Sequence, residues 1–224
     1  MEKVTCIMPT TMARRAFMPL AVQYFLRQDY PGAELLILDD STEPLEPLWP
    51  EGSNIQYLHG LGPYSSLGAK RNHACSLATG DFILHLDDDD WYAPDWISRQ
   101  VQVLTTQDAD ICGLREVNFF APGSSLGWLY IYPEHERPWV AGATMAYRKS
   151  LWERNPFPDV QVGEDNQFVW STKVRKVVTH DYTAGFVSIL HDRNTSPKYT
   201  SDMRWHPRPA DAMIALLGPD AQNY

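Results

Sequence analysis

The sequence predicts an α/β fold in which helices flank a mostly parallel, Rossmann-like central sheet within a single domain. Strand and helix patterns alternate through residues 4–105, which is typical of parallel sheets with covering helices. The chain has 224 residues, of which 44% are hydrophobic. This size and composition suit one α/β domain with a sizeable core.

Each element of the first half has its own signal. Short apolar runs predict strands at residues 4–8, 34–38, 55–58 and 81–86. Apolar residues at helical spacing predict helices at residues 14–28, 66–78 and 94–105. Pro31-Gly32 and Thr79-Gly80 are turn signals that end the first two helices. Pro94 stands at an early helical position, where proline is tolerated.

The second half is less regular. We expect a strand pair within residues 110–120, a loop at 123–127, a strand at 142–148, a short helix around Leu151, a helix at 165–173 and a strand at 177–179. The tail after His191 is rich in Pro, Arg, Asp and Trp and shows no clear periodicity. No internal repeat and no strong linker divides the chain.

Charge and cysteine content argue against several functions. The net charge of −9 disfavours nucleic acid as a partner, because binding to a phosphate backbone needs a basic surface. Cys6, Cys75 and Cys112 form no CxxC pair and are expected to be reduced core residues. No long apolar run predicts a membrane span, and no signal peptide is recognised, so we expect a cytoplasmic protein.

Four consecutive aspartates, Asp87 to Asp90, follow the apolar run at residues 82–86. Carboxylates this close repel one another unless a cation or solvent offsets their charge. Hard divalent cations take oxygen ligands, and open α/β sheets bind ligands beyond the carboxyl ends of their strands. The pattern therefore favours a divalent-metal site over a helix cap or a solvated loop.

Two further acid pairs stand at predicted element ends. Asp39-Asp40 follows the second strand and should meet the aspartate cluster at the same sheet edge, although Asp at this position also favours a turn. Glu164-Asp165 precedes an apolar helix. This pair is either an N-terminal cap, favoured by the helix dipole, or a general base beside the metal site.

Several motifs in order resemble the family 2 glycosyltransferases, the inverting nucleotide-sugar enzymes with the GT-A fold. The matching segments are Val4–Thr10, Leu36–Thr42, Gly68–Asn72, Ala78–Ile83, Leu86–Trp91 with DxD spacing, and Gly163–Asp165. The resemblance is strong over the first half of the chain and thin afterwards. No QxxRW motif of the processive polysaccharide synthases is found, and this disfavours a processive synthase.

The resemblance implies that residues 1–106 bind a nucleoside-diphosphate sugar, with a UDP-sugar favoured, and that residues 107–224 bind the acceptor. Asp40 would contact the uracil or an equivalent base. The other residues implied to bind the donor are Pro9, Thr10, Arg71, Asp87 and Asp88.

The resemblance also implies a metal and a base. Asp89 would be the main protein ligand of Mn²⁺ or Mg²⁺, with Asp87 and His191 as further ligands; for His191 an ordinary surface or core position is an equal alternative. Asp165 would be the catalytic base, and Glu164 would position the base or the acceptor. The cation would act as a Lewis acid on the leaving diphosphate, and a single displacement would invert the anomeric carbon.

The acceptor class stays open among glycans, lipid-linked glycans, proteins and small molecules. Aromatic residues at 128, 130, 132 and 139 are candidates for stacking on a sugar, or they supply core area. The segment Arg204–Arg208 is a candidate phosphate site or plain surface. Two other functions are weighed: a sugar-nucleotide nucleotidyltransferase, disfavoured because Thr10–Arg15 lacks glycine, and a non-catalytic nucleotide- or glycan-binding module.

Overall fold

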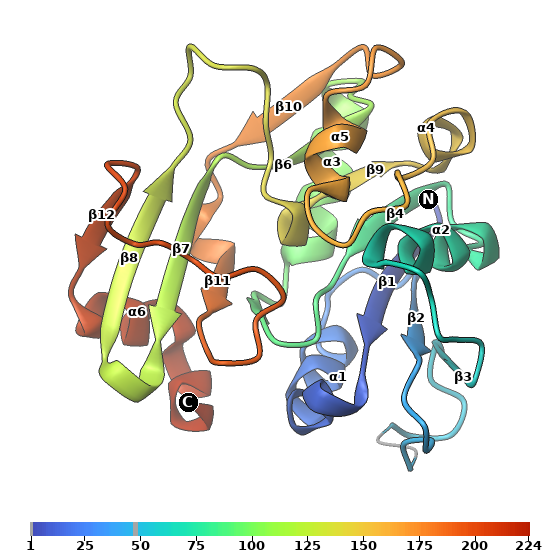
Figure 1. The fold of residues 1–224 in the computed structure, drawn as a ribbon, viewed down its shortest axis with the longest axis horizontal. Coiled ribbons are helices and arrows are strands. Elements are labelled where there is room, and N and C mark those ends of the chain that lie inside the picture. The colour runs from blue at the N-terminus through green and yellow to red at the C-terminus, as the bar shows by residue number, and fades with distance from the viewer. Residues whose placement is uncertain (1, 47–48) are drawn as a thin grey trace.

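The structure is a computed structural model that describes residues 2–46 and 49–224. Two sheets lie side by side in Figure 1. The first has the strand order β10-β6-β9-β4-β1-β2-β3. Its strands are β1 (Val4–Thr10), β2 (Ala33–Asp39), β3 (Ile55–His59), β4 (Phe82–His85), β6 (Ile111–Leu114), β9 (Ala146–Arg148) and β10 (Val177–His180). Only β9 runs antiparallel to its neighbours in this sheet, so the predicted mostly parallel sheet is confirmed.

Helices cover both faces of the first sheet. On one face α1 (Met18–Leu26) and α3 (Trp96–Thr106) share a core with β1, β2 and β4. On the other face α2 (Leu67–Leu77), α4 (Lys149–Arg154) and α5 (Glu164–Val169) pack against the opposite sides of the same strands. Strands buried on both faces are nearly continuous apolar runs, which explains why the sequence shows them clearly.

The second sheet has the order β12-β8-β7-β11-β5. Its strands are β5 (Trp91–Tyr92), β7 (Glu116–Ala121), β8 (Leu126–Ile131), β11 (Phe186–Ile189) and β12 (Trp205–Arg208). The helix α6 (Ala210–Leu217) packs against this sheet through Met213 and Leu217. Short 3₁₀ helices complete the described elements: η1 (Met12–Phe17), η2 (Pro122–Ser124), η3 (Gly142–Thr144), η4 (Thr183–Gly185) and η5 (Gly218–Asn223).

Several expected elements of the second half were wrong. The strand pair expected at 110–120 is not a pair, because β6 and β7 belong to different sheets. The strand expected at 142–148 begins as η3, and the helix expected at 165–173 ends at Val169. The strands β8, β11 and β12 and the helix α6 were not predicted. In the first half, the helix expected at 14–28 begins as the 3₁₀ helix η1.

The acid loop, residues 86–90, connects the two sheets. It leaves β4 in the first sheet and enters β5, which pairs antiparallel with β11 in the second. The backbone N–H of Asp87 donates to the hydroxyl of Tyr92 at 2.9 Å, and that hydroxyl donates to the carbonyl of Ala143 at 3.0 Å. These bonds fix the loop at the carboxyl edge of the first sheet. Among the described residues, no helix has the length and apolar character needed to cross a membrane.

Candidate active site

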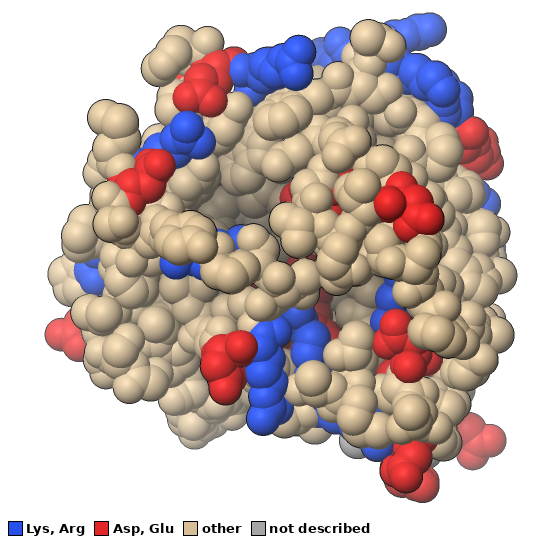
Figure 2. Space-filling model, viewed as in Figure 1, with Lys and Arg blue, Asp and Glu red and all other residues tan. Residues whose placement is uncertain are grey.

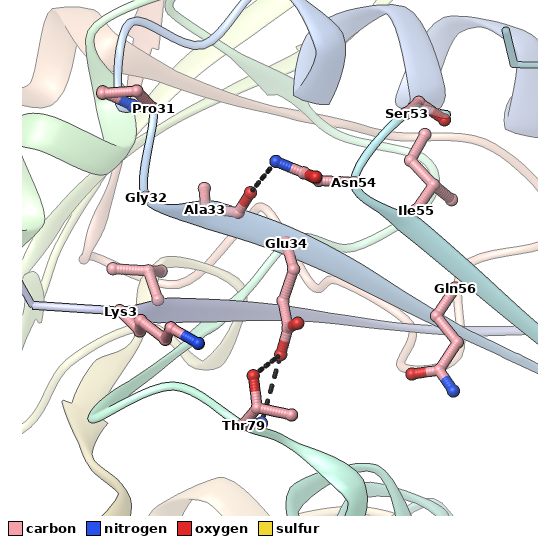
Figure 3. Close-up of a pocket in the computed structure, with 11 residues that line it drawn as sticks. Lys3, Pro31, Gly32, Ala33, Glu34, Ser53, Asn54, Ile55, Gln56 and Thr79 are labelled. Atoms are coloured by element: carbon pink, nitrogen blue, oxygen red, sulfur yellow. Dashed lines mark hydrogen bonds between the residues drawn. The ribbon is translucent and has the colours of Figure 1, made fainter. Parts of the chain in front are cut away.

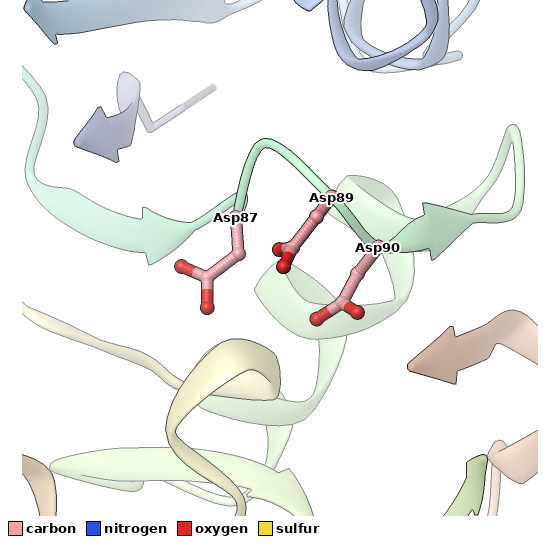
Figure 4. A group of neighbouring side chains, drawn as sticks. All are labelled: Asp87, Asp89 and Asp90. Carbon is pink, nitrogen blue, oxygen red and sulfur yellow. The ribbon is translucent and has the colours of Figure 1, made fainter. Parts of the chain in front are cut away.

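Asp87, Asp89 and Asp90 form a compact acid cluster on this loop. One carboxylate oxygen from each lies within 4.8 Å of the others, and Figure 4 shows the three side chains on the same side of the loop. Burial raises the pKa of Asp90 well above its usual value, and the charges of Asp89 and Asp87 raise it further. A set of three carboxylates fits Mg²⁺ or Mn²⁺, which prefer oxygen ligands.

His191 lies against Asp89 and holds it by a hydrogen bond. Its Nδ1 accepts the backbone N–H of Arg193 at 3.0 Å, so the proton of a neutral ring lies on Nε2. Nε2 then donates to Asp89 Oδ2 at 3.0 Å, and Asn194 Nδ2 donates to the same oxygen at 3.2 Å. In this arrangement His191 orients a carboxylate and offers no nitrogen lone pair, so its role as a metal ligand stays a prediction.

Asp88 points away from the cluster toward Arg14. The Nε and Nη2 atoms of Arg14 both lie 2.7 Å from Asp88 Oδ1, and Nη2 also forms an ion pair with Asp89. Burial raises the pKa of Asp88 to about 7, and the charge of Arg14 opposes this rise. The second oxygen, Asp88 Oδ2, is buried and has no hydrogen-bond partner within the described ranges.

A small pocket of about 120 Å³ lies beside the acid loop. Pro9, Asp40, Arg71, Asp87 and Asp88 all line it, so the structure brings most of the predicted donor residues together. The remaining one, Thr10, is adjacent and contributes its carbonyl oxygen to Lys70. Whether these residues bind a donor stays a prediction.

Lys70 is a member of this pocket that the sequence analysis did not single out. Its Nζ lies 2.9 Å from a carboxylate oxygen of Asp40. Burial lowers the pKa of Lys70, and the hydrogen bond and charge of Asp40 oppose that effect. The motif Gly68–Asn72 could have pointed to Lys70, because Lys70 stands next to Arg71 in this motif and both are buried residues of α2.

A larger cavity of about 490 Å³ opens on the other side of the acid loop. Asp87, Asp89 and Asp90 form part of its wall, and Glu164 and Asp165 from the first turn of α5 form another part. The acid cluster and the acid pair Glu164-Asp165 therefore share one cavity. Glu164-Asp165 stands at the helix start, as the capping interpretation expects, and it also faces the cavity, as the catalytic interpretation expects.

Arg71 connects the two acid groups. Its Nη1 donates to Glu164, and its Nη2 lies 3.6 Å from Asp87. The side chains of Arg71 and Glu164 are each only 5% exposed. Burial raises the pKa of Glu164, with the charge of Arg71 acting against the rise. Glu164 is thus held by Arg71, whereas Asp165 lines the cavity and accepts the backbone N–H of Asn166.

Aromatic residues line the opposite part of the larger cavity. Tyr130, Trp139, Phe119 and Trp205 belong to this wall, with ring centroids 5.2 Å apart for Tyr130 and Trp205 and 4.6 Å apart for Phe119 and Trp205. Trp139 Nε1 donates to Asn166 Oδ1 at 2.7 Å, which ties the wall to α5.

Not every aromatic or basic candidate reaches this cavity. Trp128 packs edge-on against Trp205, and Tyr132 is buried and stacks on Trp139. Both supply core area behind the wall. From the segment Arg204–Arg208, only Arg204 and Trp205 line the cavity. The space-filling view shows this face of the molecule hollowed near its centre, with acidic and basic side chains intermixed around the opening (Figure 2).

Another pocket, of about 410 Å³, lies at the amino ends of β1, β2 and β3 (Figure 3). Its acid, Glu34, accepts hydrogen bonds from Thr79 and Thr5. These bonds lower the pKa of Glu34 against the opposing effect of burial. This pocket lies at the edge opposite to the acid loop, and its acid is satisfied within the fold, so we assign it no function.

Arg14, Asn194 and Asp90 also contact the site without having been assigned to it from the sequence. Arg14 and Asn194 lie 74 and 105 residues from their aspartate partners, so no local pattern could have paired them. Asp90 belongs to the run of four aspartates, and that run predicted a metal site at this position. The structure orients it into the cluster and bonds it to the N–H of Ile189 at 3.0 Å.

The fold is that of the GT-A glycosyltransferases. S. aureus TarS 1-349 in complex with UDP-GlcNAc superposes with a TM-score of 0.68 at 17% identity, covering 88% of this chain and 61% of that TarS chain. The mannosyltransferase PcManGT from Pyrobaculum calidifontis, in complex with GDP-Man and Mn²⁺, gives a TM-score of 0.62 at 18% identity, covering 87% and 59%. At these identities the likeness concerns the fold alone.

The sequence itself matches the family model of glycosyl transferase family 2 over residues 5–154, and the chain belongs to this family. WcaA of Escherichia coli (strain K12), named as a colanic acid biosynthesis glycosyl transferase, is 34% identical over 100 residues. That match covers 42% of this chain and 35% of WcaA, so the chain spans about a third of this relative's length. The family predicted from the sequence motifs is confirmed.

Proposed function

We propose that this protein is a metal-dependent, inverting glycosyltransferase that moves a single sugar from a nucleoside-diphosphate sugar to an acceptor hydroxyl. One observation carries the proposal: the acid cluster of Asp87, Asp89 and Asp90 and the acid pair Glu164-Asp165 face the same cavity from two different elements. An inverting transfer needs an electrophilic aid on the leaving side and a base on the attacking side. The arrangement supplies a candidate for each.

The donor is proposed to lie across the small pocket and the acid loop. Asp40, with Lys70 beside it, would contact the nucleoside base, and Arg71 would hold the nucleotide next to Asp87. We favour UDP as the nucleoside diphosphate, supported by the UDP-GlcNAc complex of TarS. GDP is the second candidate, because PcManGT was solved with GDP-Man.

The acid cluster is proposed to hold Mn²⁺ or Mg²⁺ through Asp89, together with Asp87 and Asp90. The fit is supported by the three converging carboxylates and by Arg14, a cation that already pairs with Asp89. A bound divalent cation would supply Lewis-acid stabilisation of the leaving diphosphate. Asn194 and His191 would keep the Asp89 carboxylate oriented during the reaction.

The base is proposed to be Asp165. It would accept the proton of the acceptor hydroxyl as that oxygen attacks the anomeric carbon, a role that requires hydrogen-bond reach to the hydroxyl. Glu164 is bound to Arg71 and is therefore assigned a positioning role. The acceptor is proposed to be a saccharide, because aromatic faces such as those of Tyr130 and Trp205 suit the apolar faces of sugar rings.

In this proposal residues 1–106 bind the donor and residues 107–224 bind the acceptor. The aromatic wall belongs wholly to the second half. The first sheet is shared, since β6, β9 and β10 come from the second half.

Calorimetric titration of UDP, GDP, CDP and dTDP, with and without Mn²⁺, tests the donor site. We expect Mn²⁺-dependent binding of one of them to the wild type and its loss in Asp89→Ala. Asp192→Ala is the matched control, because Asp192 is exposed beside His191 and lies outside the cluster. Absence of binding for all four nucleotides would refute the proposal. Release of pyrophosphate from a nucleoside triphosphate would instead identify a nucleotidyltransferase.

A further inference from the structure

Arg14 occupies a position that the reaction itself does not explain. Its guanidinium pairs with Asp88 and Asp89 at once, and its Nη1 donates to Thr195 Oγ1 at 3.1 Å. The pairing is well shielded from water: the side chain of Arg14 is 14% exposed, that of Asp88 1% and that of Asp89 5%. The acid cluster thus contains a cation belonging to the chain itself.

This cation and a divalent metal ion would compete for the same carboxylate. Asp89 Oδ2 already receives Arg14, His191 and Asn194. A metal ion held by Asp89 together with Asp87 and Asp90 would lie within a few ångströms of the guanidinium. Two positive charges at such a distance repel strongly where water is largely excluded. Arg14 must therefore leave Asp89 when the metal ion binds.

The pockets that Arg14 lines could hold a second partner for its guanidinium, the donor diphosphate. Arg14 lines both the small pocket and the larger cavity, and it is near Lys70 and Arg71 in the former. A guanidinium binds phosphate oxygens in a bidentate manner, which makes arginine well suited to a diphosphate. The diphosphate would arrive with the metal ion and would supply the negative charge that Arg14 loses at Asp89.

We propose that Arg14 is an exchangeable counter-ion: it neutralises Asp88 and Asp89 in the absence of donor, and it transfers to the donor diphosphate when the metal ion binds. This inference rests on the proposed function, its first half on the proposed metal site and its second half on the proposed donor. It implies that Arg14 weakens metal binding on its own and strengthens nucleotide binding. The two ligands are therefore coupled through one side chain, and the coupling is reciprocal.

Binding of Mn²⁺ alone, measured by electron paramagnetic resonance of the free ion, tests the first half. We expect Arg14→Ala to bind Mn²⁺ about tenfold more tightly than the wild type. Arg14→Gln removes the charge but keeps a hydrogen-bond donor for Asp88, and it should behave in the same way. Arg14→Lys retains the charge and should stay close to the wild type. Arg15→Ala is the matched control, because Arg15 belongs to the same turn and donates to the carbonyl of Glu43 instead.

Binding of the nucleoside diphosphate at saturating Mn²⁺ tests the second half. We expect about tenfold weaker binding in Arg14→Ala and Arg14→Gln, with binding of the corresponding nucleoside unchanged. Unchanged or weaker Mn²⁺ binding in the folded Arg14→Gln variant would overturn the exchange, even if the wild type binds nucleotide as proposed. Conversely, if no nucleotide binds to the wild type, the proposed function fails while the Mn²⁺ comparison still decides the competition at Asp89.

Discussion

The carboxylate of Asp165 packs directly against the α-carbon of Gly142. A β-carbon added at Gly142 would lie 2.3 Å from Asp165 Oδ2, which is closer than real contacts allow. The candidate base thus has its position set by the absence of a side chain 23 residues earlier, in the 3₁₀ helix η3.

Gly142→Ala is expected to displace the Asp165 carboxylate and to lower kcat with little loss of stability. The carboxylate lies at the end of a side chain and is able to rotate away, so the fold tolerates the methyl group. Small displacements of a reacting group are costly to rate, and we expect a fall of about a hundredfold. Gly123→Ala is the control, since a β-carbon there meets nothing within 4 Å. Equal activity of the two variants would contradict the assignment of Asp165.

Asp165→Asn keeps the size of the side chain and removes its ability to accept a proton as a base. We expect kcat to fall by about 10² to 10⁴, the usual contribution of a general base, while the affinity for nucleoside diphosphate stays unchanged. Calorimetry and a transferase assay on the same preparation check both statements. A variant with wild-type turnover would show that another group acts as the base.

Glu164→Ala should destabilise the protein because it leaves Arg71 buried without its main partner. Breaking a buried ion pair on one side costs about 3–5 kcal/mol, measurable by urea unfolding. The exposed pair of Arg99 and Asp95 provides the comparison, and Arg99→Ala should leave the unfolding midpoint nearly unchanged. Similar midpoints for both variants would mean that Arg71 finds compensation in Asp87.

Tyr130→Ala tests the aromatic wall. We expect a KM for the acceptor that is about tenfold higher, consistent with the loss of roughly 1–1.5 kcal/mol of aromatic contact, and an unchanged KM for the donor. Trp170→Ala removes another partly exposed aromatic side chain that does not line the cavity. If Tyr130→Ala raised both KM values equally, the wall would serve the structure and not the acceptor.

His180 should make the stability of the fold dependent on pH. Burial lowers the pKa of His180 to about 4, whereas an unfolded histidine has a pKa of about 6.5. The unfolded state therefore binds more protons between these values, and the stability contribution of neutral His180 is lost as the pH falls from about 6.5 to 4. Buried carboxyls with raised pKa values, such as Asp88, change the stability with pH in the opposite direction. Their contribution is removed by comparing the wild type with a variant that lacks only His180.

The comparison is with His180→Gln, in urea unfolding at several pH values. The difference in the free energy of unfolding between wild type and variant should shrink by roughly 1 kcal/mol per pH unit of acidification within this window. A difference that stays constant with pH would mean that the pKa of His180 is the same in the folded and unfolded states.

The first half of the fold was predictable because its strands are buried on both faces. β1, β2 and β4 are short apolar runs followed by turn signals, and the parallel arrangement follows from their alternation with helices. The second sheet was not predictable in the same way. β12 contains Pro207 and lies at an edge, and β11 depends on pairing with β5 and β7, which lie far away in the sequence.

The site likewise has a part that was predictable from the sequence and a part that was not. The convergence of Asp40, Asp87 and Asp88 on one pocket follows from the rule that parallel strands end at one edge. The placement of Glu164-Asp165 beside the metal site was one of two interpretations of the residues, and that of His191 came from the resemblance to a family; the structure brings Glu164 and His191 to the same region. The contact of Arg14 with the cluster has no local signal, because it joins residues from different elements. Their catalytic and binding roles, like the cytoplasmic location, stay predictions.

The acid loop is anchored in two sheets, at β4 on one side and at β5 on the other. A relative movement of the two sheets at this point would act on the residues between these anchors, which include the four aspartates. The distance between Asp87 and Asp90 therefore depends on how the two sheets are aligned. The proposed cation site is therefore expected to respond to movement of the second sheet, because Asp90 leads directly into a strand of that sheet.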